Sequence, residues 1–224
     1  MAANPAGRST RFPRRHTWPR RELGLEETSP ALGRALVTVA GTWALLALTP
    51  LFALAMEPGW AVVASFGLCC GFAGVRGLGS ELQGCLSPRH WGPGLLLGWL
   101  ILPGLALAIT GLGRALGLPT PPTPHASGGP AFFTATVVLA PVFEEWIYRG
   151  QLFPALASRL GRSAGLVLSS AAFAIPHAET WPVFAAFWVG LLLGALRWGG
   201  QALGVCMGVH AGLNLHLFFL GRAC

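Results

Sequence analysis

The chain has 224 residues, of which 53% are hydrophobic and only 10% charged, a composition too apolar for an ordinary soluble domain. Its formal charge of +7 comes from 15 Arg against eight Glu. Because the main Arg cluster lies in a short tail before the first apolar segment, a nucleic-acid partner is not expected. The five Cys have no metal-type spacing and suit apolar packing.

Residues 1–33 form a basic, proline-containing tail that we expect to be cytoplasmic and largely disordered. Residues 34–222 read as a single transmembrane helical domain. About seven helices are predicted, with a range of six to eight, in an all-α polytopic membrane protein with a polar catalytic cluster inside the bundle. The predicted spans are 35–56, 59–75, 91–113, 131–160, 163–177, 181–196 and 201–220. The Pro-rich stretch 118–124 must be a loop.

The distribution of Arg predicts the orientation of the helices. Most Arg residues fall on one side of the membrane if the N-terminus is cytoplasmic, and only Arg114 and Arg222 fall on the other. We therefore expect a multi-pass membrane protein with its N-terminus in the cytoplasm.

The stretch 141–150 lies inside an apolar segment and contains two adjacent carboxylates. Glu145 and Arg149 are four residues apart, the spacing of an intrahelical ion pair, whereas Glu144 points about 100° away from Glu145. A carboxyl group in a low-dielectric site resists ionisation, which suits a general base near neutral pH. The alternative is a buried structural network of both Glu with Arg149.

Two later segments add polar side chains to the apolar helices. Phe173 and His177 are four residues apart near the end of the fifth span, and His210 and Asn214 lie on one face of the seventh. Alone, each His is more often a packing residue or a partner in an interhelical hydrogen bond, and His216 is expected to be structural. Glycines at every fourth position predict close packing on another face of the last helix: Gly200, Gly204, Gly208 and Gly212.

Counting 1.5 Å per residue from the helix ends places Glu144, His177 and Asn214 at a similar depth, about 10 Å inside the outer boundary by this count, with His210 one turn deeper. We therefore expect these polar groups, from three helices, to converge on one point.

The motifs Glu144-Glu145-x-x-x-Arg149, Phe173-x-x-x-His177 and His210-x-x-x-Asn214, in this order, resemble those of the CAAX-prenyl-endopeptidase and bacteriocin-processing (CPBP, Abi) family of intramembrane proteases. The protease-like core would be 131–220, and the myxosortase-like bacterial branch is one candidate within the family. This branch implies a location in the bacterial inner (cytoplasmic) membrane.

The resemblance implies that Glu144, helped by His177, activates a water, and that His210 and Asn214 stabilise the oxyanion. Glu145, Arg149 and Phe173 would shape the site. We expect no metal and no cofactor, because the sequence lacks a compact ligand cluster. The alternative is zinc held by Glu144, His177 and His210.

The expected function is hydrolysis of a peptide bond in a membrane-associated or exported protein, at a C-terminal sorting tail or a leader. The partners would be this substrate and the lipid bilayer. Two alternatives use the same polar cluster differently. One is a non-catalytic membrane immunity or scaffold protein, and the other is a small proton- or ion-coupled transporter.

Overall fold

The computed structural model describes residues 28–56, 58–75, 88–118, 129–177 and 180–223, and this part of the chain is helical without a strand. The predicted all-α class is confirmed there. Most of the predicted tail lies outside the described residues, but the first helix already begins at Thr28, before the predicted boundary at residue 33.

Each of the seven apolar segments corresponds to helix. The first three correspond to α1 (Thr28–Leu46) with the short α2 (Thr49–Ala53), to α3 (Pro58–Val75) and to α5 (Pro88–Ala115). The last three correspond to α9 (Arg162–Ala174) with the 3-10 turn η4 (Ile175–His177), to α10 (Thr180–Trp198) and to α11 (Leu203–Ala223).

The fourth segment is one continuous helical rod with two widened stretches. Its successive parts are α6 (Pro130–Phe133), the π-helical η2 (Thr134–Leu139), α7 (Ala140–Glu145), the π-helical η3 (Trp146–Leu152) and α8 (Phe153–Leu160). The predicted long helix is therefore present, but its π-helical turns were not predicted. Such turns are rare and occur often at functional sites.

Glycine ends the rod and separates the last two helices. Gly161, between α8 and α9, has φ of 84°, and Gly200, between α10 and α11, has φ of 87°. Residues with a side chain rarely adopt this left-handed backbone, so glycine allows the chain to reverse at both places.

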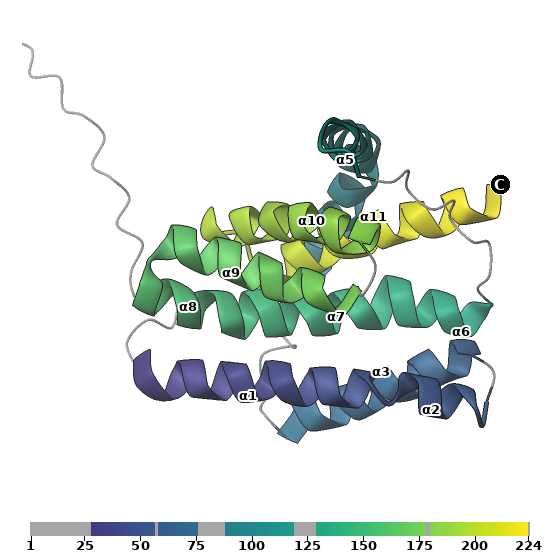
Figure 1. Cartoon of the computed structure of the whole chain (residues 1–224), viewed down its shortest axis with the longest axis horizontal. Helices are drawn as coiled ribbons and strands as arrows, with labels where there is room; N and C mark the ends of the chain where they lie inside the picture. The colour runs from purple at the N-terminus through teal and green to yellow at the C-terminus, as the bar shows by residue number, and fades with distance from the viewer. Residues whose placement is uncertain (1–27, 57, 76–87, 119–128, 178–179, 224) are drawn as a thin grey trace, which may run out of the picture.

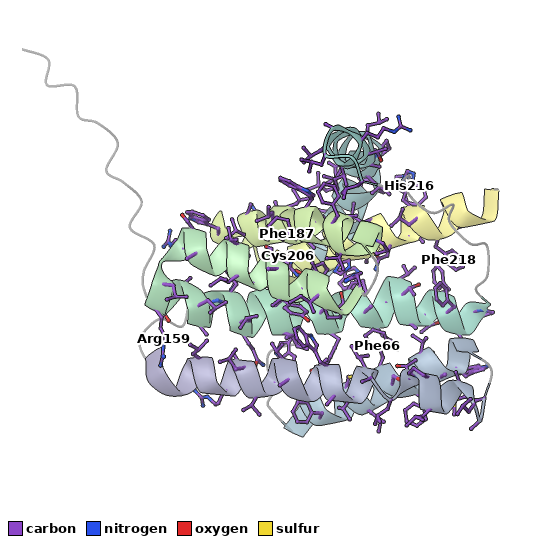
Figure 2. All side chains as sticks on the ribbon, in the orientation of Figure 1. Phe66, Arg159, Phe187, Cys206, His216 and Phe218 are labelled. Atoms are coloured by element: carbon purple, nitrogen blue, oxygen red, sulfur yellow. The ribbon has the colours of Figure 1, made fainter. Side chains whose placement is uncertain are left out.

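The rod from α6 to α8 lies at the centre of the fold. In Figure 1, α1 to α3 cover one side of it, and α9, α10 and α11 cover the other, with α5 beyond α11 and seen nearly end-on. Buried apolar side chains from the rod, chiefly Phe143, Trp146 and Ile147, form the middle of the core. Figure 2 shows Phe66 on the α3 side of the rod and Cys206 on the opposite side.

Helices α5 and α11 pack backbone against backbone through glycine. A Cβ atom at Gly208 would lie 2.9 Å from the nitrogen of Leu95, and one at Gly212 would lie 2.8 Å from the nitrogen of Trp99. These two glycines thus form the predicted close-packing face, whereas Gly200 precedes the helix.

Three helices in the described part of the chain are long and apolar enough to cross a membrane, namely Leu32–Ala53, Arg89–Ala115 and Pro130–Leu160. Trp60–Cys69, Pro182–Trp198 and Leu203–Phe219 are apolar but shorter. Helix α9 has 13 residues, which reach about 20 Å against a hydrocarbon core of about 30 Å. The membrane character is confirmed, but seven complete spans are not.

Candidate active site

The predicted ion pair lies at the centre of the rod. Arg149 Nη1 donates to Glu145 Oε1 over 2.9 Å, and the two side chains are 1% and 0% exposed. Their spacing puts them on the same face of the helix, as expected. Since charges without partners are costly in an apolar interior, each of these groups depends on the other for its place there.

Arg149 also ties the rod to two neighbouring helices. Its Nη2 donates to the main-chain oxygen of Gly190 on α10 over 2.9 Å. Its guanidinium lies 4.4 Å from the ring centre of Phe173 on α9, within range of a cation–π interaction. Arg149 thus holds the rod against α9 and α10.

Glu144 has a different environment from its neighbour. Its side chain is 20% exposed, and it takes no part in the pair between Glu145 and Arg149. Its Oε2 lies 3.9 Å from His210 Nε2, too far for a direct hydrogen bond. One carboxylate is therefore fixed in a buried network, and the other is left facing an imidazole.

His210 lies between the two carboxylates. Its Nδ1 is 3.0 Å from Glu145 Oε1, and its Nε2 is the atom that faces Glu144. The ring also packs edge-to-face against Phe173, with ring centres 5.6 Å apart. The structure thus brings His210 together with Glu144, Glu145 and Phe173, whereas the count along the helices places His210 one turn deeper than Glu144.

His177 lies close to this group but bonds elsewhere. It lies in η4, just beyond the end of α9, and its side chain is exposed. Its Nδ1 is 3.2 Å from the oxygen of Ala174, and its ring lies 5.4 Å from that of Phe173. His177 therefore lies beside Phe173 at the exposed end of α9, without a direct contact to Glu144.

Asn214 points to another part of the rod. Its Nδ2 donates to the main-chain oxygen of Thr136 in η2 over 2.8 Å. Because Thr136 lies eight residues before Glu144, the predicted equal depth of Asn214 and Glu144 is wrong, and His210 lies at the level of Glu144 instead. His216 is structural, as predicted, with Nδ1 3.3 Å from the oxygen of Trp99 on α5 (Figure 2).

Two contacts at the site were not anticipated from the sequence. Trp43 Nε1 on α1 donates to the hydroxyl oxygen of Tyr148 over 2.8 Å. The Tyr148 ring packs at 90° against Phe173, with ring centres 5.4 Å apart. Phe173 thus contacts a cation, two imidazoles and a phenol. The N–H of a buried Trp and the O–H of a buried Tyr usually each find a hydrogen-bond partner, but the sequence does not say which residue that partner is.

The chemistry of the site is that of carboxylates and imidazoles in an apolar interior. At this site, Glu145 Oε2 is buried and has no hydrogen-bond partner among the described residues. Among the described residues, no group of three or more His, Cys, Asp or Glu side chains is arranged to hold a metal ion. The arrangement can accept protons at Glu144 and His210 and can polarise groups through His210 and Arg149.

Comparison with known families supports the resemblance. Residues 126–216 match the family described as type II CAAX prenyl endopeptidase Rce1-like, and this segment contains all three motifs. No curated protein and no solved structure matches the chain. The match confirms the resemblance inferred from the motifs and implies protease activity in a membrane protein.

Proposed function

We propose, from the premise that residues 126–216 form the core of a CAAX-type protease, that this chain is an intramembrane endopeptidase of the glutamic type. It would hydrolyse a peptide bond of a membrane-associated or exported protein with a water activated by Glu144. The observation that carries the proposal is that the two adjacent carboxylates have different surroundings. Glu145 is held by Arg149, whereas Glu144 is partly exposed and faces His210 Nε2.

The reaction follows from these positions. Glu144 removes a proton from a water whose oxygen attacks the carbonyl carbon of the substrate, forming a C–O bond and a tetrahedral oxyanion. His210, when protonated, and Asn214 would stabilise that oxyanion, provided that the Asn214 amide turns from Thr136. The C–N bond then breaks, and the proton passes to the leaving amine. His177, whose ring lies beside Phe173, would assist the water.

The positions of the Arg residues support the predicted orientation of the helices. The start of α1, the junction of α8 with α9 and the end of α10 lie together at one end of the molecule in Figure 1. Four Arg residues belong to these helix ends, and Figure 2 labels one of them, Arg159. The full set is Arg34, Arg159, Arg162 and Arg197.

Positive residues favour the cytoplasmic side, so we propose the bacterial inner membrane with this end inside. Glu144 lies near the middle of the rod Pro130–Leu160. A substrate chain would have to enter the bundle to reach it. A C-terminal sorting tail or a leader that itself lies in the membrane meets that requirement.

The test compares wild type with Glu144→Gln in the native host, by mass spectrometry of membrane and surface proteins. The amide keeps the shape of the side chain but cannot act as a base, so hydrolysis should fall by about 10²-fold or more. Thr134→Val, an exposed change of similar shape on the same rod, is the matched control and should leave processing intact. Tails or leaders left uncleaved only in the Glu144 variant would support the proposal and name the substrates.

The opposite result is equally informative. Normal processing by a folded, expressed Glu144→Gln protein would refute the catalytic assignment. The same polar cluster would then be better explained by a non-catalytic role.

A further inference from the structure

We infer that Glu145 is a positioning residue, which holds His210 with its ring proton on Nδ1 and turns Nε2 toward Glu144. The observation is that one imidazole spans two adjacent carboxylates through opposite nitrogens. Nδ1 lies 3.0 Å from Glu145 Oε1, and Nε2 lies 3.9 Å from Glu144 Oε2. The effect of this arrangement on peptide hydrolysis rests on the proposed function. The position of the ring proton of His210 does not depend on it.

The hydrogen bonds around Glu145 determine where the proton is. Arg149 has only donors, so its 2.9 Å bond to Glu145 Oε1 makes that oxygen an acceptor. A second short contact to the same oxygen, from His210 Nδ1, must then also come from a donor. The neutral ring therefore has its hydrogen on Nδ1 and a free lone pair on Nε2. This is the arrangement by which a buried carboxylate fixes the tautomer of a catalytic histidine.

The rest of the fold prevents the ring from leaving this position. Phe173 packs against it edge-to-face. On the opposite side of the helix, Gly208 and Gly212, two residues before and after His210, lie against the backbone of α5. Helix α11 therefore cannot rotate or slide without separating these backbones. The close-packing face and the polar face of α11 serve one purpose, which is to fix the direction of one imidazole.

The consequence is a defined order of proton transfers. In the resting site, Nε2 and Glu144 Oε2 are both acceptors, so a water within reach of both can donate one hydrogen to each. His210 can donate to an oxyanion only after Nε2 has gained a proton. Glu145 thus acts on the reaction through His210, without contacting the substrate.

The direct test is ¹⁵N NMR of the full chain in lipid nanodiscs with ring-labelled histidine. The chain has six His, and the signals missing from His210→Asn identify His210. In the wild type, the neutral ring should be protonated on Nδ1, and Glu144→Gln should leave this unchanged. A proton on Nε2 in the wild type would overturn the inference.

The second arm removes the anchor without stranding a charge. Glu145→Leu combined with Arg149→Met replaces the buried pair by apolar groups of similar size, a change that proteins often tolerate. The His210 proton should then be found on Nε2, and kcat should fall by about 10²-fold with KM unchanged. A folded double variant with the wild-type tautomer and kcat would show that Glu145 is merely structural.

A third arm remains informative if the double variant does not fold. The amide nitrogen of Asn overlies Nδ1 of a histidine, whereas that of Gln overlies Nε2. His210→Asn should therefore keep the hydrogen bond to Glu145, and its melting temperature should be higher than that of His210→Gln. Neither variant should hydrolyse peptides. The reverse order of melting temperatures would contradict the inference. The expected tautomer without any peptide hydrolysis would instead refute the proposed function alone.

Discussion

Replacing Arg149 by Met tests how much the central network stabilises the fold. Met has a similar length but cannot donate, so Glu145 would be left as a buried carboxylate without its charged partner. Breaking one side of a buried ion pair costs about 3–5 kcal/mol. The bond to the Gly190 oxygen, a charged donor on a buried carbonyl, is lost as well, at about 1.5–3 kcal/mol.

These two contributions overlap, because both arise from one guanidinium. We therefore expect Arg149→Met to lower the free energy of unfolding by about 5 kcal/mol, a large part of the usual 5–15 kcal/mol. Adding Glu145→Leu should restore about 3 kcal/mol, since it removes the stranded charge. Arg114→Met, at an exposed position on α5, is the control and should change stability by less than about 0.5 kcal/mol.

The assay is unfolding of the purified protein in detergent micelles by titration with SDS, followed by the fluorescence of its nine Trp residues. Our reasoning would be refuted if Arg149→Met cost less than about 1 kcal/mol. Glu145→Leu is also measured alone. The reasoning would be refuted as well if the loss of stability in the double variant equalled the sum of the losses in Arg149→Met and Glu145→Leu, because the two residues would then not be coupled.

Further predictions concern packing, the link to α1, metal dependence and orientation. Gly212→Ala should lower stability by about 2 kcal/mol, because its Cβ would lie 2.8 Å from a main-chain nitrogen of α5, whereas Gly104→Ala, in open space on α5, should not lower it. Trp43→Phe should cost about 1 kcal/mol by removing the bond to Tyr148, and a similar loss when Tyr148 is already Phe would contradict this. Metal chelators should not slow peptide hydrolysis, and a loss of activity restored by added zinc would favour the zinc alternative. A reporter fused after Arg222 should be active outside the cytoplasm, and activity in the cytoplasm alone would show the opposite orientation.

The sequence predicts the local features of this fold well. Apolar segments between Pro, Gly and Arg residues locate the helical segments of the described ranges, because burying polar groups in a membrane is costly and the cost is set locally. The spacing of Glu145 and Arg149 predicts their ion pair for the same reason, since four residues along a helix return to one face.

Features that depend on neighbouring helices could not be predicted in the same way. Asn214 and His210 share a face, yet Asn214 reaches the oxygen of Thr136, because the π-helical turn η2 lies beside it. The bond of Arg149 to Gly190 involves a main-chain oxygen, which leaves no mark in the sequence. The roles of the individual site residues remain predictions for the experiments above.

The contact of one imidazole with two carboxylates also decides how charge is balanced in the apolar interior. The four groups are Glu144, Glu145, Arg149 and His210. Once a water has given up a proton in the proposed reaction, that proton is on Glu144 or on His210. With that proton on Glu144, the charges of Glu145 and Arg149 cancel. With it on His210, two anions face two cations. The net charge is zero in both states, so a proton can cross the 3.9 Å between Glu144 and His210 without leaving an uncompensated charge where lipid and protein offer none to balance it.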